Sequence, residues 1–463
     1  MVQLLERMND FVWGVPALLL ILGVGVYLTL RTGFAQLRLL PNALKLFVKR
    51  FTAKRQNKDG VSPYQALCTA LAATVGTGNL AGVAGAIAIG GPGSVFWMWI
   101  CAFFGMIIKF AEAALAVRYR RKNQEGEFVG GPMYMIQQGM GNRWAWLGSL
   151  YCFFGVVAAF GAGNATQINA MVGGVNSVIK AYGGQEHIAI NLSIGIISGV
   201  LVAVLLCGGA KRIGRAAEQL VPFASVLYLL LGFGALILNY KNIPFAFEVI
   251  FKGVYEPRSV TGGVIGSAFV ALRIGASRGV FTNEAGMGTA SIAHASADVD
   301  HPVQQGAMGI IEVFLDTIVI CTLTALVILS SGIDIAYGID TGVELTSQAF
   351  AATLGGWVCV PIALILCCFA FATVLGWGLY GARCAQYLFG HNAWKKFVVL
   401  SVVMVVVGAI VKTGTVWMFS ETINGLMAIP NLIAVAALSP ELLRLLRSYK
   451  KSPTRLGRRC GSD

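Results

Sequence analysis

The sequence predicts an all-α polytopic membrane protein with about eleven transmembrane helices. Hydrophobic residues make up 56% of the 463 residues and charged residues only 12%, whereas soluble domains carry about 25% charged residues. The hydrophobic residues gather in long runs, many of them near the roughly 20 residues that a helix needs to cross a bilayer. These runs lack the alternation of polar and apolar residues that is typical of a transmembrane β-barrel.

The apolar runs divide into a first span and two groups of five. The predicted spans cover residues 11–30, 63–90, 93–117, 144–178, 188–207, 214–238, 263–297, 303–330, 356–388, 396–411 and 415–438. The predicted regions are an N-terminal span with a basic amphipathic linker (1–62), a first five-helix group (63–238), an extracellular connection (239–262), a second group (263–440) and a basic tail (441–463). The first run has no basic segment before it and no small-residue cleavage site, so we interpret it as a retained helix.

Lys and Arg residues concentrate on one side of this layout. The net charge is +14, and most of the 35 Lys and Arg residues follow odd-numbered spans, chiefly in residues 31–58, 118–143 and the C-terminal tail. Because positively charged loops stay in the cytoplasm, we expect a plasma-membrane protein with its N-terminus outside and its C-terminus inside. The positive charge then faces anionic lipid headgroups, and no nucleic-acid partner is needed to explain it.

The second span is interrupted at its centre by residues 72–82, Ala-Ala-Thr-Val-Gly-Thr-Gly-Asn-Leu-Ala-Gly. Each glycine costs a helix about 1 kcal/mol relative to alanine, and in lipid a broken helix is tolerated only where it is buried or lines a cavity. The carbonyls that end the first half suit a small cation, and the N–H groups that start the second half suit a carboxylate. The alternative is a packing helix with small residues, which does not explain the polar residues Thr74, Thr77 and Asn79 within two turns.

The seventh span, residues 263–297, has the same character. An apolar half meets residues 273–279, Arg-Ile-Gly-Ala-Ser-Arg-Gly, and then residues 282–289, Thr-Asn-Glu-Ala-Gly-Met-Gly-Thr. We place its break at Gly275–Ser277. Interrupted segments at corresponding positions of two halves indicate the binding site of a transporter. Since the first group begins inside and the second outside, the two groups are expected to be inverted relative to each other.

Four motifs carry a resemblance to a known family: Gly-Thr-Gly-Asn-Leu-Ala-Gly at 76–82, Gly-Gly-Pro-Met-Tyr at 130–134, Asn-Glu-Ala-Gly-Met-Gly at 283–288 and Phe-Ala-Thr-Val-Leu-Gly-Trp at 371–377. On these motifs, and over nearly its whole length, the chain resembles the alanine or glycine:cation symporter family. The resemblance implies a LeuT-type fold, with a 5+5 inverted repeat and one extra N-terminal helix. It also implies sodium-coupled uptake of alanine or glycine, with some members accepting D-alanine.

An amino-acid zwitterion in a dry site needs donors for its carboxylate and acceptors for its ammonium group. We assign the carboxylate to N–H groups at the start of the second half-helix, and the ammonium group to carbonyls in both breaks. Gln167 either contacts the substrate or forms an interhelical hydrogen bond, and Trp377 either caps the pocket or is structural. The predicted substrate site comprises Thr74, Thr77, Gly78, Asn79, Gln167, Gly275, Ala276, Ser277 and Trp377.

By similarity to LeuT-type symporters, a sodium ion (Na+) would bind between the first broken helix and the ninth span. Its ligands would be the carbonyls of Ala72, Val75 and Phe369 and the hydroxyl of Thr373. Such symporters often place a second hydroxyl where this chain has Ala372, so one side-chain ligand is missing here.

Coupling to protons is an alternative to coupling to sodium, because carboxylates inside spans can carry protons and intramembrane ionisable groups are functional candidates. Glu312 and Asp316 lie four residues apart on one face of the eighth span, and we expect them to pair with Arg273 or Arg278, the alternative being that they sense a cation. Glu284 is expected to cap N–H groups in the second break. If the transporter is coupled to protons, Glu284, Glu312 and Asp316 would carry them.

Two other functional classes find little support. An ion channel predicts repeated pore-lining motifs or a filter sequence, and an enzyme predicts clustered catalytic or metal-binding residues. The two breaks differ from each other, and the four His residues are scattered along the chain. The predicted partners are therefore a small neutral amino acid, sodium and the lipid bilayer, and the oligomeric state is left open.

Overall fold

The computed structural model describes residues 7–9, 11–52, 61–339, 342–411 and 414–451, and these are almost entirely helical. The elements of the first part are α2 (Val15–Thr32), α3 (Ala35–Thr52), α4 (Pro63–Thr74), η1 (Gly78–Gly82), α5 (Val83–Gly90), α6 (Gly93–Arg118), β1 (Arg121–Lys122), β2 (Phe128–Val129), α7 (Pro132–Tyr134), η2 (Met135–Met140), η3 (Asn142–Trp144), α8 (Ala145–Phe160), η4 (Gly161–Ala165), α9 (Thr166–Ala181), α10 (Ile188–Leu206) and α11 (Gly209–Leu238).

The remaining elements are η5 (Tyr240–Asn242), α12 (Ile243–Tyr255), α13 (Pro257–Val260), α14 (Ala268–Asn283), α15 (Thr289–Ala295), α16 (Pro302–Val313), η6 (Phe314–Cys321), α17 (Thr322–Ser330), α18 (Val343–Leu354), η7 (Gly356–Val358), α19 (Cys359–Phe389), α20 (Ala393–Gly408), α21 (Gly414–Ala437) and α22 (Ser439–Lys451). The two short strands pair antiparallel, with Arg121 opposite Val129.

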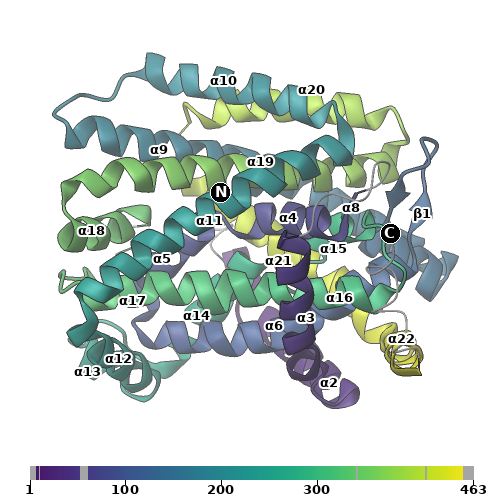
Figure 1. Ribbon diagram of the computed structural model, residues 1–463, viewed down its shortest axis with the longest axis horizontal. Coiled ribbons are helices and arrows are strands. Elements are labelled where there is room, and N and C mark those ends of the chain that lie inside the picture. Colours follow the sequence, from purple (N-terminus) through teal and green to yellow (C-terminus); the bar gives the residue numbers. More distant parts are fainter. Residues whose placement is uncertain (1–6, 10, 53–60, 340–341, 412–413, 452–463) are drawn as a thin grey trace.

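Most long helices run side by side in one bundle (Figure 1), and two of them pack against several others. α6 packs against α14, α15 and α16, whereas α19 packs against α4, α8, α9 and α11. The broken helix α4–α5 therefore lies between two groups of helices, each gathered around one central helix. This arrangement places the first break predicted from the sequence, in α4–α5, between the two groups.

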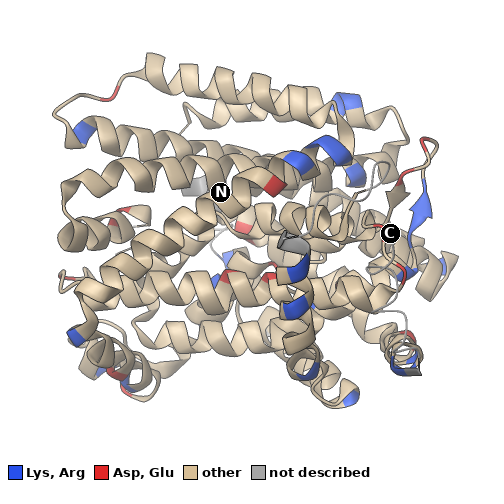
Figure 2. Ribbon diagram, viewed as in Figure 1, with Lys and Arg blue, Asp and Glu red and all other residues tan. Residues whose placement is uncertain are grey.

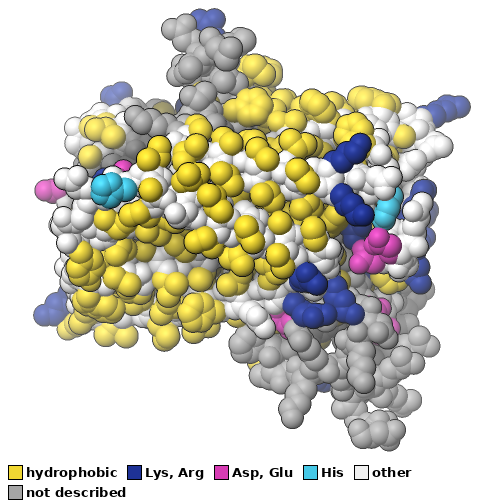
Figure 3. All heavy atoms as spheres, turned by 90° about the horizontal axis from the view of Figure 1, so that it is seen from above, with side chains coloured by type: hydrophobic (Ala, Val, Ile, Leu, Met, Phe, Trp, Pro, Cys, Tyr) yellow, Lys and Arg dark blue, Asp and Glu magenta, His cyan; other side chains and the backbone are white. Residues whose placement is uncertain are grey.

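Charged residues lie mainly toward the ends of the bundle (Figure 2), and few lie along the middle of its helices. The face in Figure 3 is covered by hydrophobic side chains over most of its length, with Lys and Arg toward one end. Only 22% of the most apolar stretch of helix α10 is buried. A large exposed apolar surface of this kind suits contact with lipid.

Within the described residues, six helices are long and apolar enough to cross a membrane, or up to nine if each bent pair of helices is one span. The bent pairs are α2 with α3 (80°), α4 with η1–α5 (49°) and α21 with α22 (56°). Local sequence explains where some helices begin. For example, α4 begins at Pro63 behind a capping box formed by Ser62 and Gln65, which satisfies two of the N–H groups at its start.

Candidate functional site

The first break lies where the sequence places it. α4 ends at Thr74, and the next helical turn is turned away by 49°. In a continuous helix, the N–H of Gly76 would donate to Ala72 and that of Asn79 to Val75. Instead the Gly76 N–H donates to Asn79 Oδ1 (2.8 Å), and the Asn79 N–H donates to the Gly76 carbonyl (3.3 Å). The carbonyls of Ala72 and Val75 are thereby released from the helical pattern.

The side chain of Asn79 faces away from the predicted carboxylate position. Its Nδ2 donates to Asp316 Oδ1 (2.7 Å), and Asp316 Oδ2 accepts from the Thr317 hydroxyl (2.8 Å). Thr317 Oγ1 in turn accepts from Asn283 Nδ2 (3.1 Å), and Asn283 Oδ1 accepts from the Ala285 N–H (2.9 Å). A continuous chain of hydrogen bonds thus joins the two breaks through η6. Because the Asn79 N–H is used within the first break, only the Thr77 and Gly78 N–H groups remain from the predicted set.

The prediction that the second break lies at Gly275–Ser277 is wrong. α14 continues through these residues to Asn283, and the break spans Glu284 to Gly288, where Glu284, Gly286 and Gly288 have φ values of 53°, 94° and 77°. Gly275 instead allows close packing on α6, since a Cβ added there would lie 2.3 Å from the Ser94 carbonyl oxygen. Gly275, Ala276 and Ser277 are not among the residues that line the cavity described below.

Glu112 and Asn431 hold the backbone of the second break. Glu112 Oε1 accepts hydrogen bonds from the Gly286 N–H (3.0 Å) and from Asn431 Nδ2 (2.6 Å), while Asn431 Nδ2 also donates to the Gly286 carbonyl (2.8 Å). The capping role expected for Glu284 therefore belongs to Glu112. Glu284 Oε2 instead accepts from the Thr289 hydroxyl (2.5 Å).

A small cavity lies between the two breaks. About 330 Å³ of space between atoms lies in and around it, part of which is open to solvent, and about 20 Å³ of this space is open to the centre of a water molecule. Its lining residues are Ala73, Thr74, Gly76, Thr77, Gly78, Ala162, Gln167, Phe281, Glu284, Thr373, Trp377 and Asn424. The wall therefore combines small residues and two aromatic rings with a few polar groups, as ligand sites do.

Gln167 joins two walls of this cavity. Its Oε1 accepts a hydrogen bond from the Thr77 hydroxyl (3.0 Å), and its Nε2 donates to the Ala162 carbonyl (3.0 Å). Gln167 therefore forms the interhelical hydrogen bond that was one of its two predicted roles, and it also lines the cavity, so that its contact with a substrate stays a prediction.

The residues proposed for sodium come from two segments that face each other. Thr373 Oγ1 donates to the Phe369 carbonyl (2.9 Å), and a Cβ added to Gly76 would lie 2.7 Å from the same hydroxyl oxygen. α19 and the end of α4 are thus in close contact beside the released carbonyls of Ala72 and Val75. The donor set is made of oxygen atoms only, which are the ligands that hard cations prefer.

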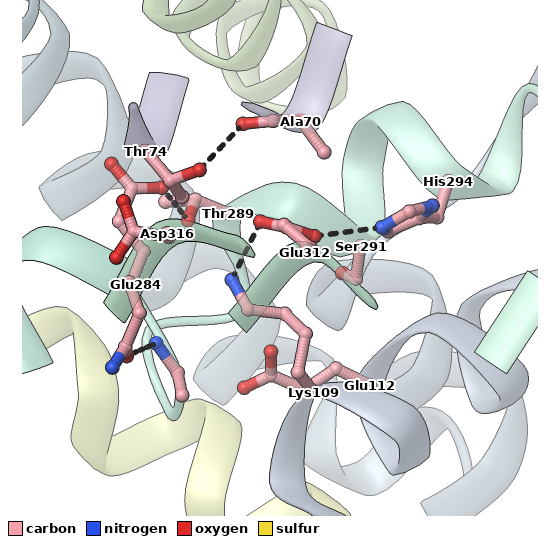
Figure 4. Close-up of polar contacts among 12 residues, drawn as sticks. Ala70, Thr74, Lys109, Glu112, Glu284, Thr289, Ser291, His294, Glu312 and Asp316 are labelled. Atoms are coloured by element: carbon pink, nitrogen blue, oxygen red, sulfur yellow. Dashed lines mark hydrogen bonds and ion pairs between the residues drawn. The ribbon is translucent and has the colours of Figure 1, made fainter. Parts of the chain in front are cut away.

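A buried ion pair lies behind the second break (Figure 4). Lys109 Nζ is 3.2 Å from Glu312 Oε1, and Glu312 Oε2 is 2.9 Å from His294 Nε2, with all three side chains fully buried. Gln305 Nε2 contacts both His294 Nδ1 (2.7 Å) and the Pro63 carbonyl (3.4 Å). Since the carbonyl can only accept, the amide nitrogen of Gln305 is the donor, so His294 Nδ1 accepts and Nε2 carries the proton that faces Glu312.

The expectation that Glu312 and Asp316 pair with Arg273 or Arg278 is wrong, because Lys109 and Asn79 hold these carboxylates. Arg278 instead pairs with Glu421 of α21, at 2.9 Å. Glu421 is also held through its backbone carbonyl, which accepts from Trp13 Nε1 (2.7 Å). The Arg278–Glu421 pair lies one helical turn from the cavity-lining residues Phe281 and Asn424.

Six cavity residues were not part of the predicted substrate or sodium site: Ala73, Gly76, Ala162, Phe281, Glu284 and Asn424. Glu284 carried a signal, since it is an acidic residue in an interrupted span. Asn424 is likewise a polar residue in an apolar segment, but the sequence does not say which neighbouring helix or cavity it faces. Ala72, Val75 and Phe369, which were predicted as sodium ligands, are not among the residues that line the cavity.

Comparisons with known proteins identify relatives of this chain. A family model described as the sodium:alanine symporter family matches residues 1–459. The sodium/alanine symporter AgcS of Methanococcus maripaludis is 43% identical over 455 residues, covering 97% of each chain. The amino-acid carrier protein AlsT of Bacillus subtilis is 36% identical over 451 residues, covering 97% of this chain and 92% of its own. The solved structure of MhsT in complex with L-phenylalanine is 14% identical and has a TM-score of 0.59, covering 85% of this chain and 99% of that chain, so the two share a LeuT-type fold.

Proposed function

The chain belongs to the sodium:alanine symporter family, a family of transporters and not of enzymes, and we propose that it couples the uptake of a small neutral amino acid to sodium. The proposed substrates are L-alanine and, with it, D-alanine and glycine. Uptake would proceed by alternating access, in which one group of helices moves relative to the other around a central site. AgcS, by its name, is a sodium/alanine symporter, which supports this choice of substrate.

The observation that carries the proposal is the cavity between the two breaks. Three of its lining residues are glycine or alanine in the first break, and the rings of Phe281 and Trp377 limit its extent. Because the wall brings small residues and two rings close together, we propose a ligand whose side chain is a hydrogen atom or a methyl group. We therefore favour glycine and alanine over large amino acids.

The substrate carboxylate would bind the N–H groups of Thr77 and Gly78, which start the second half of the broken helix beside the cavity. N–H groups at a helix start have no partner in their own helix, and the helix dipole favours a negative charge there. The hydrogen bond from Thr77 to Gln167 holds this turn in place. The carbonyl of Thr74, across the break, would accept from the ammonium group.

Sodium would bind beside the substrate, between α4 and α19. The ligands would be the carbonyls of Ala72, Val75 and Phe369 and the hydroxyl of Thr373. The diverted N–H groups of the first break support this assignment, because they leave the first two carbonyls free of the helical pattern. Binding of sodium at this junction would favour a conformation in which α4 and α19 stay in contact, which also completes the cavity wall.

Proton coupling is the second candidate, and one observation favours it. Glu284 lines the cavity itself, so a proton on its carboxyl group would be in contact with the substrate. Asp316 lies in the hydrogen-bond chain between the breaks, whereas Glu312 is held by Lys109 and His294. Of the three carboxylates, Glu284 is therefore the one best placed to couple a proton to transport.

We further propose the topology predicted from the sequence: eleven spans in a 5+5 inverted arrangement behind one extra N-terminal helix, with the N-terminus outside and the C-terminus in the cytoplasm. The regions 1–62, 63–238, 239–262, 263–440 and 441–463 keep their proposed roles. The clustering of Lys and Arg toward one end of the bundle supports this orientation (Figure 2).

Uptake of labelled L-alanine into proteoliposomes tests the proposed function. An inward sodium gradient without a proton gradient is expected to drive accumulation of alanine above the equilibrium level. An ionophore that dissipates the sodium gradient should abolish this accumulation. Accumulation driven by a proton gradient alone would establish the second candidate. Absence of alanine and glycine uptake under both gradients would refute the proposed substrate class.

A further inference from the structure

Asn424 is a buried polar residue of the cavity wall whose side chain holds an acceptor atom without a partner among the described residues. Its side chain is 2% exposed and lines the cavity from α21, an element outside the predicted site. Among the described residues, its Oδ1 atom has no hydrogen-bond partner. A buried acceptor without a partner costs about 1–3 kcal/mol, so such a group in a cavity wall points to a ligand that supplies a donor.

The turn of α21 that carries Asn424 is held from two sides. Three residues earlier, Glu421 pairs with Arg278 of α14 and its carbonyl accepts from Trp13. One residue later, a Cβ added to Gly425 would lie 2.4 Å from Val12, so α21 packs closely on the segment before α2. The position of Asn424 is therefore fixed by the surrounding helices.

The chemistry of the substrate then identifies the donor. Glycine and alanine carry a carboxylate, which only accepts hydrogen bonds, and a side chain that has no polar atom. Their ammonium group is the only donor they have, and it has three N–H bonds. We propose that Asn424 Oδ1 accepts a hydrogen bond from the substrate ammonium group. This proposal rests on the proposed function, and it supplies an acceptor in place of those predicted at Gly275–Ser277, which lie in the continuous helix α14.

Two other side-chain acceptors of the cavity wall already have partners. Glu284 Oε2 accepts from the Thr289 hydroxyl, and Gln167 Oε1 accepts from Thr77. Asn424 Oδ1, by contrast, is a buried acceptor that lacks a partner among the described residues. An amide oxygen is neutral, so it contributes to ammonium binding without adding a charge to the site.

The test compares binding of L-alanine, glycine and L-serine to the purified full-length protein and to variants at position 424. Asn424→Leu has a similar volume and no acceptor, and Asn424→Asp keeps an oxygen at the same place. Asn164→Leu is the matched control, because Asn164 is also buried with an unpartnered Oδ1 but does not line the cavity. Monodispersity and circular dichroism establish folding, and Asn424→Ala replaces the leucine variant if that variant does not fold.

Asn424→Leu is expected to weaken binding of all three ligands in parallel, by about 10- to 100-fold, the range for a lost hydrogen bond to a charged group. Asn424→Asp and Asn164→Leu are expected to stay within a few-fold of the parent. An unchanged affinity in Asn424→Leu, or a loss confined to serine, would overturn the assignment, the latter because Asn424 would then contact the side chain. A parent protein that binds neither alanine nor glycine would refute the proposed function itself, before any variant is compared.

Discussion

Replacing Lys109 by methionine tests the charge balance behind the second break. The change keeps an unbranched chain of similar length but leaves Glu312, which is fully buried, with His294 as its remaining partner. Removing one member of a buried ion pair typically costs about 3–5 kcal/mol, because the other charge is left without compensation. Glu312→Gln alone leaves Lys109 unpaired and is expected to cost a similar amount.

The double variant separates this explanation from a loss of packing. With Lys109→Met and Glu312→Gln together, neither member of the pair is left as an unpaired charge, and His294 Nε2 can still donate to the new amide oxygen. Replacing both members of a buried pair is often nearly neutral, so the double variant should be more stable than either single variant.

The melting temperature of the purified protein measures this effect. Unfolding entropies of about 2.1 cal/mol/K per residue, taken over 463 residues, convert about 3–5 kcal/mol into a decrease of about 3–5 °C for each single variant. Lys180→Met is the control, since its pair with Glu186 is largely exposed, and it should leave the melting temperature unchanged. If the double variant lost as much as the two single variants combined, the charge explanation would be refuted.

Three further predictions rest on other contacts in the structure. Thr373→Ala should raise the sodium concentration needed for half-maximal alanine binding by about tenfold, equal to ~1.4 kcal/mol, with little change at saturating sodium; an unaltered sodium requirement would move the ion site elsewhere. Gly275→Val should lower stability by about 1–3 kcal/mol, because its Cβ would lie 2.3 Å from the Ser94 oxygen, while the folded fraction binds alanine normally; a selective loss of alanine affinity would return Gly275 to the binding site. The hydrogen bond from Arg118 lowers the pKa of Glu441, so its stabilising contribution is present above about pH 4.3 and is lost as the pH falls through the lowered value; Glu441→Gln should therefore flatten the melting temperature between neutral and acidic pH, and identical profiles would contradict this.

The first break was predictable because its signals are local. Three glycines and three polar residues fall within ten positions of one apolar segment, and the structure interrupts the helix among them. The second break was misplaced because two glycine-containing stretches follow each other in the seventh span. Gly275 allows α6 to pack closely on α14, whereas Gly286 allows a positive φ in an unwound turn. The sequence alone does not distinguish these two roles of glycine.

The polar partners could not be derived from the sequence, since they depend on how distant helices pack. Lys109 and Glu312 are about 200 positions apart, and nothing in the sequence near either residue identifies the other as its partner. The same holds for Asn424, which reaches the cavity from the last apolar helix of the bundle. The predicted pairing of Glu312 and Asp316 with Arg273 or Arg278 of the preceding span failed for this reason.

The measurement that tests the central claim most directly is the affinity for L-alanine over a range of sodium concentrations at constant pH and ionic strength. If the cavity and the ion position between α4 and α19 are coupled, sodium must strengthen alanine binding and alanine must strengthen sodium binding by the same factor. We predict that the dissociation constant for alanine falls as sodium rises and levels off when the ion site is full. A dissociation constant that does not change with sodium would contradict the proposed coupling of the two sites.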